Sequence, residues 1–152
     1  MARAPFQVLV FLFHREPDAS LRYAVFCRAD CRTWQGIAGG GEEAEAPEEA
    51  ARREAAEEAG VDAHGEVLAL ASRAEIPVSE FGAQPAWPTD LTTIPEFSFA
   101  MPATPASVRL SAEHTAVEWL RYEDALSRLH WPSNRRALSE LHRRLNSTAP
   151  AP

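Results

Sequence analysis

The segment GGGEEAEAPEEAARREAAEEAGV, residues 39–61, carries the strongest structural signal of the chain. After Pro47 it consists of Ala, Glu and Arg up to Ala59, and all three are strong helix formers. Pro47 suits the first position of a helix, and Gly60 suits the residue just after one. The sequence therefore predicts a helix over residues 47–59 that follows a glycine-rich turn at residues 39–41.

The acidic side chains of this helix are clustered on one side. At about 100° per residue, Glu54, Glu57 and Glu58 fall within one arc of about 100°. Like charges at this spacing destabilise a helix, and hard divalent cations prefer carboxylate and carbonyl oxygens. A solvated helix face explains the other glutamates of the segment better. For these three, spacing alone leaves metal ligands and surface charges as alternatives.

The rest of the chain predicts a mixed α/β domain. Short apolar runs between turn residues predict strands at residues 6–13, 21–27, 33–38, 66–76, 94–101 and 115–120. Two more helices are expected at residues 122–129 and 134–145. Residues 77–93 contain several prolines without a clear period and are expected to form a long loop. Ala51, Ala55 and Ala59 would let the first helix pack closely on the sheet.

Length and composition set limits on function. The chain has 152 residues and a net charge of −7, which fits one domain with its own core. The acidic balance argues against broad nucleic-acid binding, which needs a basic surface. No stretch has the roughly 20 apolar residues of a membrane span. Cys27 and Cys31 lack a second Cys or His pair, so free thiols in a cytoplasmic protein are expected.

The same segment resembles the signature of the Nudix hydrolase family. The signature is Gly, five residues, Glu, seven residues, Arg-Glu, an apolar residue, any residue, Glu-Glu, any residue, Gly and an apolar residue. The fixed positions are all present: Gly39, Glu45, Arg53, Glu54, Glu57, Glu58, Gly60 and Val61. Ala55 is smaller than the aliphatic residue that the family usually has there.

The resemblance implies the Nudix fold, an α/β/α sandwich with a mixed β-sheet, over residues 1–146, with a disordered tail at 147–152. It also implies that water attacks a phosphorus of a diphosphate group, with Mg²⁺ or alternatively Mn²⁺ as the cofactor. Arg53 would orient Glu54 or Glu57, and Glu45 would brace the junction before the helix. The implied metal ligands are Glu54, Glu57, Glu58 and the Gly39 carbonyl.

The C-terminal half resembles the family branch that hydrolyses dATP and dihydroneopterin triphosphate. The resemblance rests on Glu113-His114, Trp119-Leu120, Trp131 and Ser133-Asn134-Arg135, together with Arg28 and Trp34-Gln35. In that branch the residue at the position of Glu113 is a metal ligand from outside the signature. Glu54 and Glu113 are both candidates for the general base, and the sequence does not choose between them.

Five residues are candidates for substrate binding. Gly40 and Gly41 would allow close approach of a phosphate to the backbone. Arg28 and Arg135 offer guanidinium groups for phosphate oxygens. Trp87, in the long loop, could stack on a flat ring, although packing within the loop is its default role.

These patterns together predict a Mg²⁺-dependent pyrophosphohydrolase for a nucleoside or pterin polyphosphate, with substrates like dATP and dihydroneopterin triphosphate favoured. Nucleotide sugars and dinucleoside polyphosphates are alternative substrates. A Nudix-fold module that senses a nucleotide without turnover, and an interaction domain with a solvated acidic helix, are the alternative functions. The sequence is compatible with either a monomer or a homodimer.

Overall fold

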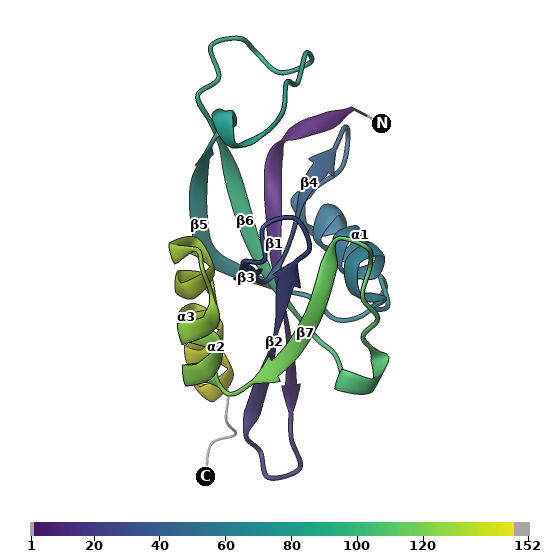
Figure 1. Ribbon diagram of the computed structural model, residues 1–152, viewed down its shortest axis with the longest axis vertical. Helices are drawn as coiled ribbons and strands as arrows, with labels where there is room; N and C mark the ends of the chain where they lie inside the picture. The colour runs from purple at the N-terminus through teal and green to yellow at the C-terminus, as the bar shows by residue number, and fades with distance from the viewer. Residues whose placement is uncertain (1, 148–152) are drawn as a thin grey trace.

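The computed structural model describes residues 2–147, which form a seven-stranded mixed sheet with helices on both faces (Figure 1). The strands are β1 Arg3–Arg15, β2 Leu21–Arg28, β3 Trp34–Gln35, β4 Ile37–Glu42, β5 Leu68–Pro77, β6 Thr93–Pro102 and β7 His114–Leu120. The helices are α1 Pro47–Ala59, α2 Tyr122–Arg128 and α3 Pro132–Ser147, with 3-10 turns η1 Val78–Glu80 and η2 Pro105–Ser107. The predicted α/β/α sandwich is confirmed.

Strand β1 lies at the centre of the sheet. It pairs with β6 in parallel and with β2 and β4 in antiparallel orientation. The sheet order is β3-β2-β1-β6-β5, with β4 also on β1 and β7 also on β2. Because β1 contacts three strands, residues distant in the sequence meet along it.

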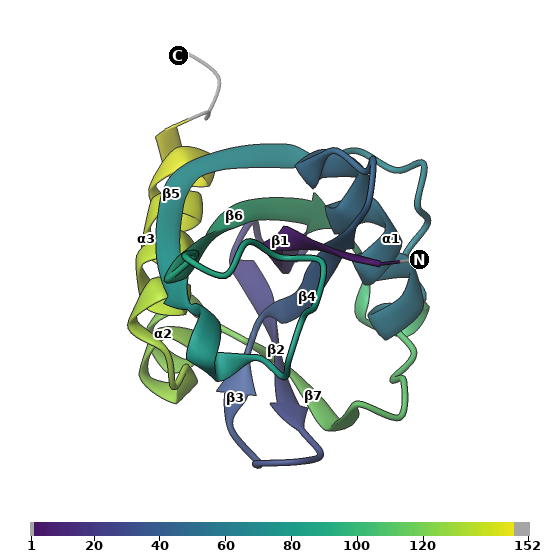
Figure 2. The same ribbon diagram turned by 90° about the horizontal axis from the view of Figure 1, so that it is seen from above.

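The alternation of β1 divides the core into two halves. Val8 and Val10 pack on the α1 side, whereas Leu9 and Phe11 pack on the side of α2 and α3. Successive strand residues point to opposite faces, so an almost continuous apolar run serves both layers. Seen from above, α1 lies on one side of the sheet, and α2 and α3 lie on the other (Figure 2).

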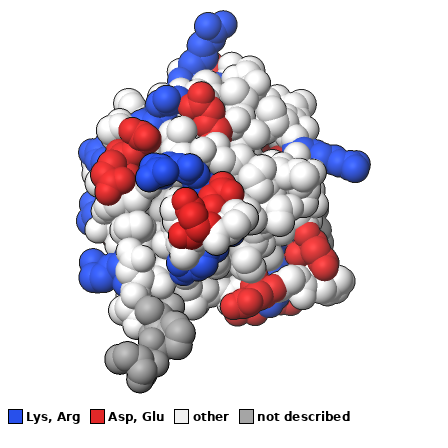
Figure 3. Space-filling view, turned by 90° about the horizontal axis from the view of Figure 1, so that it is seen from below, with Lys and Arg blue, Asp and Glu red and all other residues white. Residues whose placement is uncertain are grey.

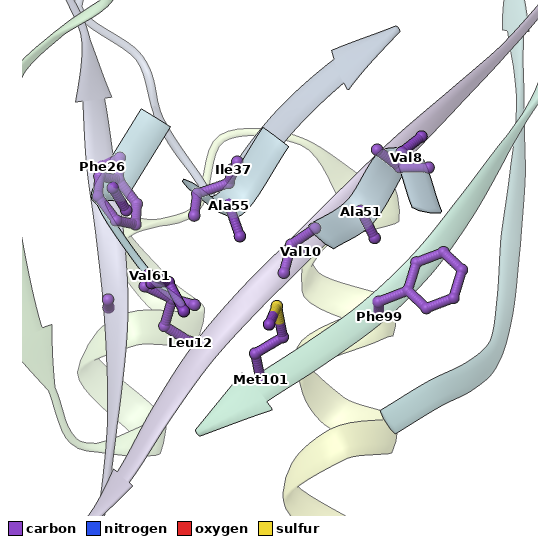
Figure 4. Packing of buried hydrophobic residues seen from close by; sticks show 13 residues of the cluster. Val8, Val10, Leu12, Phe26, Ile37, Ala51, Ala55, Val61, Phe99 and Met101 are labelled. Atoms are coloured by element: carbon purple, nitrogen blue, oxygen red, sulfur yellow. The ribbon is translucent and has the colours of Figure 1, made fainter. Parts of the chain in front are cut away.

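Small side chains seat α1 on the sheet, as predicted. Ala51 and Ala55 are fully buried and face Val10, Phe99 and Met101 (Figure 4). Gly60 ends the helix at φ 72°, in the left-handed region, and its N–H donates to the Ala56 carbonyl at 3.0 Å. The alanine stripe thus buries one flank of α1 and leaves the adjacent flank for its glutamates.

The sequence-based element boundaries need four corrections. The predicted strand 33–38 is split into β3 and β4, and the glycines at residues 39–41 lie inside β4 rather than in a turn. They remain extended because β4 is hydrogen-bonded to β1 in this stretch. The loop 77–93 contains η1, and α3 continues through Ser147, so only residues 148–152 of the predicted tail lie outside the described part.

Charged residues of both signs are interspersed on the face seen from below (Figure 3). Among the described residues, that face offers no continuous basic surface of the kind that binds nucleic acid. Within residues 2–147, no helix is long and apolar enough to cross a membrane.

Candidate active site

Arg53 connects the acidic helix to the glycine strand. Its guanidinium donates to both carboxylate oxygens of Glu45, at 2.8 and 3.0 Å, and to the Gly40 carbonyl at 2.9 Å. It also donates to Glu54 at 3.0 Å and to Glu57 at 3.2 Å. The Arg53 guanidinium lowers the pKa of Glu45. Arg53 therefore fixes β4, the segment before α1 and two glutamates relative to one another.

Glu54 lies directly against the glycine strand. The residue is only 8 % exposed, and a Cβ at Gly39 would lie 2.1 Å from Glu54 Cδ. Glycine is therefore required at residue 39 if this carboxylate is to keep its place. Burial raises the pKa of Glu54; the Arg53 charge opposes this, and Glu57 and Glu113 add to it.

Glu58 faces the segment that leads into β7. It is 4 % exposed, and it accepts a long hydrogen bond from Ser111 Oγ at 3.5 Å. His114 Nδ1 lies 3.4 Å from Glu58 Oε2 but lacks hydrogen-bond geometry. Burial also lowers the pKa of His114, so we assign a neutral imidazole. Burial, and then Glu113, raise the pKa of Glu58 to about 8.

The segment that carries Glu113 is bonded to the end of α1. The Arg109 N–H donates to the Ala59 carbonyl at 2.8 Å, and the Ser111 N–H donates to the Glu58 carbonyl at 3.2 Å. The Glu113 carbonyl in turn accepts from the Ala29 N–H at 2.9 Å. These backbone bonds bring Glu113 beside Glu58, although 54 intervening residues separate them in the sequence.

The acidic groups fit a hard divalent cation by their chemistry. Glu54 and Glu58 each interact electrostatically with Glu113, and Glu54 also interacts with Glu57. Glu54 and Glu58 are the buried members, and their raised pKa values favour bound protons, which a cation can replace. Among the described residues, no three acidic, His or Cys side chains already surround one point. A cation would therefore require rotation of these side chains, most of all Glu57, which turns toward Arg53.

A cavity of about 660 Å³ extends from this constellation across the sheet. Gly39, Glu54 and Glu113 line one end of it. Trp131 and Asn134, at the start of α3, line it as well, and α3 lies on the side of the sheet opposite α1 (Figure 2). The volume of the cavity lies in the range of small-molecule sites. The cavity therefore joins a carboxylate end to an end with an aromatic wall.

Two predicted substrate residues line this cavity. Gly40 forms part of its floor, with the Arg3 side chain packed over its α-carbon. Arg28 also lines it, but its guanidinium forms two bonds to Asp30, at 2.8 and 2.7 Å. Arg28 can meet a phosphate only through its remaining donors or after it leaves Asp30.

The other three lie outside the cavity lining. Gly41 faces Phe6, because a Cβ there would lie 2.0 Å from the Phe6 ring. Arg135 donates to the carbonyls of Leu129 and His130, at 2.9 and 3.1 Å, and the neighbouring Arg136 lines the cavity in its place.

Trp87 is the third. It is buried and donates from Nε1 to the Arg3 carbonyl at 2.8 Å. Its ring lies edge-to-face with Phe81, with 6.0 Å between the ring centroids. The position of Trp87 supports its default role of anchoring the long loop, rather than the predicted substrate contact.

Sequence reasoning missed several polar residues on the cavity wall, among them Arg3, Gln7 and Glu96. Gln7 and Glu96 each interrupt an apolar strand, and such an interruption was the available signal. Nothing in the local sequence indicated that the two strands pair side by side.

The whole chain was compared with known proteins. The NUDIX domain family model matches residues 6–141. A Listeria monocytogenes protein described as a NUDIX hydrolase has a similar structure, with 38 % identity, a TM-score of 0.85 and coverage of 95 % of this chain and 96 % of that one. No curated protein matches the chain.

More distant structures share the fold. The E. coli dihydroneopterin triphosphate pyrophosphohydrolase is 23 % identical, with a TM-score of 0.73 and coverage of 91 % of this chain and 95 % of that one. The NUDIX domain of Shewanella oneidensis NrtR, solved with ADP ribose, is 15 % identical, with a TM-score of 0.70 and coverage of 95 % and 90 %.

The fold and the carboxylate-lined cavity define a hydrolase of pyrophosphate bonds. The chain belongs to the NUDIX domain family.

Proposed function

We propose that the protein is a divalent-cation-dependent hydrolase of a nucleoside or pterin triphosphate, with substrates like dATP and dihydroneopterin triphosphate favoured. The observation that carries this proposal is the position of the carboxylates. Glu54 and Glu113 line one end of a cavity whose other end is walled by Trp131. If the polyphosphate of a substrate binds beside Glu54 and Glu113, the ring of that substrate can lie beside Trp131.

Each residue of the carboxylate end has an expected task. Glu54, Glu57, Glu58, Glu113 and the Gly39 carbonyl would hold the cation, Mg²⁺ or alternatively Mn²⁺. Such an ion supplies charge neutralisation on the phosphate oxygens and acidifies water. Arg53 would keep Glu54 oriented through the bond described above, and Glu57 would leave its bond to Arg53 to hold the cation. Gly40 would leave room for the Arg3 side chain, which lies over it at the cavity floor.

The reaction is a displacement at phosphorus. A water oxygen forms a bond to phosphorus, and the bond to the bridging oxygen breaks, so that the phosphate beyond it leaves. The proton of the water passes to a carboxylate, and Glu54 and Glu113 are the two candidates for this base. Both reach the cavity, whereas Glu57 points to Arg53.

A substrate panel with matched variants tests the proposal. Purified protein is incubated with Mg²⁺ and dATP, dGTP, dihydroneopterin triphosphate, a nucleotide sugar or a dinucleoside polyphosphate, and the released phosphates are measured. Glu58→Gln and Glu57→Gln should each lower kcat/KM by about 100-fold or more, because charge stabilisation at the phosphates is lost. Glu48→Gln, on the exposed part of the same helix, should leave activity unchanged.

Two outcomes would overturn the proposal. Full activity of Glu58→Gln would separate the carboxylate end from the chemistry. Nucleotide binding without turnover, in the presence of Mg²⁺ or Mn²⁺, would make the protein a sensing module instead. Product analysis in ¹⁸O-labelled water identifies which phosphorus is attacked.

A further inference from the structure

The cavity floor is a single row of residues across four strands. Ala74 on β5 is opposite Glu96 on β6, Glu96 is opposite Gln7 on β1, and Gln7 is opposite Gly40 on β4. All four line the cavity. Because Ala74 and Gly40 are small, Gln7 and Glu96 are the groups of this row that offer hydrogen bonds to a bound ring.

Glu96 has one acceptor oxygen in use and one without a partner. Its Oε2 accepts from Gln7 Nε2 at 2.9 Å, and Gln7 Oε1 accepts in turn from an Arg3 nitrogen at 3.1 Å. Glu96 is 3 % exposed, and its Oε1 has no hydrogen-bond partner among the described residues. Burial raises the pKa of this carboxyl, and Gln7, Ser133 and the Arg136 charge only partly offset that rise. Ser133, which also lines the cavity, lies near the carboxyl without reaching hydrogen-bond geometry. An unpaired buried acceptor is rare and points to a missing partner.

Arg3 presents the complementary group. Its Nε is buried and has no hydrogen-bond partner among the described residues, and its guanidinium lies 4.4 Å from the Phe81 ring centroid. The same cavity is thus lined by a residue with a free acceptor and a residue with a free donor, linked through Gln7.

Asn134 on α3 and Trp131, the residue before this helix, are already engaged. Asn134 Oδ1 accepts from the Gly36 N–H at 2.9 Å, and Trp131 Nε1 donates to Gln35 at 3.2 Å. These bonds fix the aromatic wall and leave its π-face for a flat ring. Among the described residues that line the cavity, Glu96 and Arg3 carry the buried polar atoms without a hydrogen-bond partner, so we take these two residues to select among rings.

We propose that Glu96, positioned by Gln7, accepts hydrogen bonds from the 2-amino-4-oxopyrimidine edge shared by guanine and pterin, and that the site thereby discriminates against adenine. This inference rests on the proposed function and narrows it: of the two substrates favoured there, it retains dihydroneopterin triphosphate and disfavours dATP. The edge carries an amino group and a ring N–H side by side, which suit a carboxylate. It ends in a carbonyl oxygen, which suits Arg3 Nε.

Adenine differs from guanine and pterin at the ring nitrogen in the middle of the corresponding edge. Its ring nitrogen there is an acceptor, so its lone pair would face the carboxylate. A site built for a donor rejects a ligand that lacks it, because the buried group stays unpaired. A hydrogen bond to a charged group changes binding by roughly 10- to 100-fold. We therefore expect kcat/KM for dGTP or dihydroneopterin triphosphate to exceed that for dATP by this factor.

The test compares Glu96→Gln with Glu123→Gln, which makes the same chemical change on the exposed surface of α2. Glu96→Gln should lower the ratio of kcat/KM for dGTP over dATP roughly 10-fold or more, because an amide nitrogen or a weaker acceptor then faces the ring. Glu123→Gln should leave the ratio unchanged. Gln7→Met, which removes the group that orients Glu96, should lower the ratio by a smaller factor and serves if Glu96→Gln fails to fold.

The outcomes separate this inference from the proposed function. If the wild type hydrolyses both nucleotides and Glu96→Gln slows them equally, the ring assignment is wrong while the hydrolase proposal stands. A wild type that prefers dATP also overturns the assignment. If the protein hydrolyses none of the substrates, the affinities of guanosine, neopterin and adenosine, measured by calorimetry, still test the ring assignment. Equal affinities for the three, or no effect of Glu96→Gln on them, reject it.

Discussion

The two ends of the cavity are built in different ways. The carboxylate end rests mainly on α1 and β4, so Arg53, Glu54 and Glu58 are close in sequence, and Glu113 alone comes from a distant segment. The ring end, by which we mean the part of the cavity with Gln7 and Glu96 on its floor, depends on pairing between β1 and β6, where these two residues are 89 positions apart. The first end is a local pattern that recurs across a family, and the second can change through single substitutions. We infer that the chemistry is fixed at one end while the substrate is chosen at the other.

The largest effect is expected from a substitution that disturbs the carboxylate end and leaves the ring end intact. Gly39→Ala places a Cβ within 2.1 Å of Glu54 Cδ, so the carboxylate must move. A displacement of about 1 Å at a reacting group lowers rates by around 100-fold, and overpacking destabilises by about 1–3 kcal/mol. Steady-state kinetics and thermal melting measure the two effects.

Gly82→Ala is the matched control, because a Cβ at this loop position would meet nothing within 4 Å. It should leave kcat/KM unchanged and should not lower the melting temperature. Retention of wild-type kcat/KM by Gly39→Ala would show that the contact between Glu54 and β4 has no part in the reaction.

A second prediction concerns pH and stability at the carboxylate end. The pKa of Glu58 in the folded protein is raised to about 8, above its value of about 4.3 in an unfolded chain. The folded state therefore binds this proton more tightly, and stability falls as pH rises from about 4.5 to 8. In the presence of EDTA, the melting temperature should drop by several degrees between pH 6 and pH 8.

Mg²⁺ should reverse this loss, with more stabilisation at pH 8 than at pH 6, because the ion competes with protons. Glu58→Gln has no titrating group at this position and should show a flatter profile in EDTA. A profile identical to that of the wild type would exclude Glu58 as the source of the pH dependence.

The smallest effect is expected from a substitution of Trp87, which lies beside the ring end. Trp87→Phe keeps an aromatic ring but removes the hydrogen bond to the Arg3 carbonyl. The loss should be about 0.5–1.5 kcal/mol in the free energy of unfolding, with kcat/KM changed less than 10-fold and equally for all substrates. Denaturant unfolding and the substrate panel measure these effects. A loss confined to one ring type would instead place Trp87 against the substrate.

The sequence predicted the elements whose signals are local. Helix α1 was predicted at its observed bounds, because Pro47, the alanine stripe and Gly60 all act within one segment. The glycines of β4 were misassigned, since glycine disfavours a strand unless a neighbouring strand and close-packed side chains hold it there. Arg3, Phe6 and Glu54 occupy the space that the three glycines leave, and none of these contacts is visible in the local sequence.

The substrate residues were harder to predict for the same reason. Arg135 and Trp87 carry suitable chemistry, but their bonds to backbone carbonyls use it for local structure. Glu96 has the same residue type as many surface glutamates, and only its place in a central strand buries it. A residue type therefore predicts a functional role well only when its neighbours in the fold are also its neighbours in the sequence.

The hydrogen bonds from Arg109 and Ser111 to the last turn of α1 constrain how this chain can vary. They set the path length from the helix end to Glu113 and so fix where that carboxylate arrives. Insertions before Arg109, around η2, leave that length unchanged and are compatible with an intact cation-binding end. A single residue inserted between Ser111 and Glu113 would move the carboxylate away from its neighbours while all of α1 remained in place.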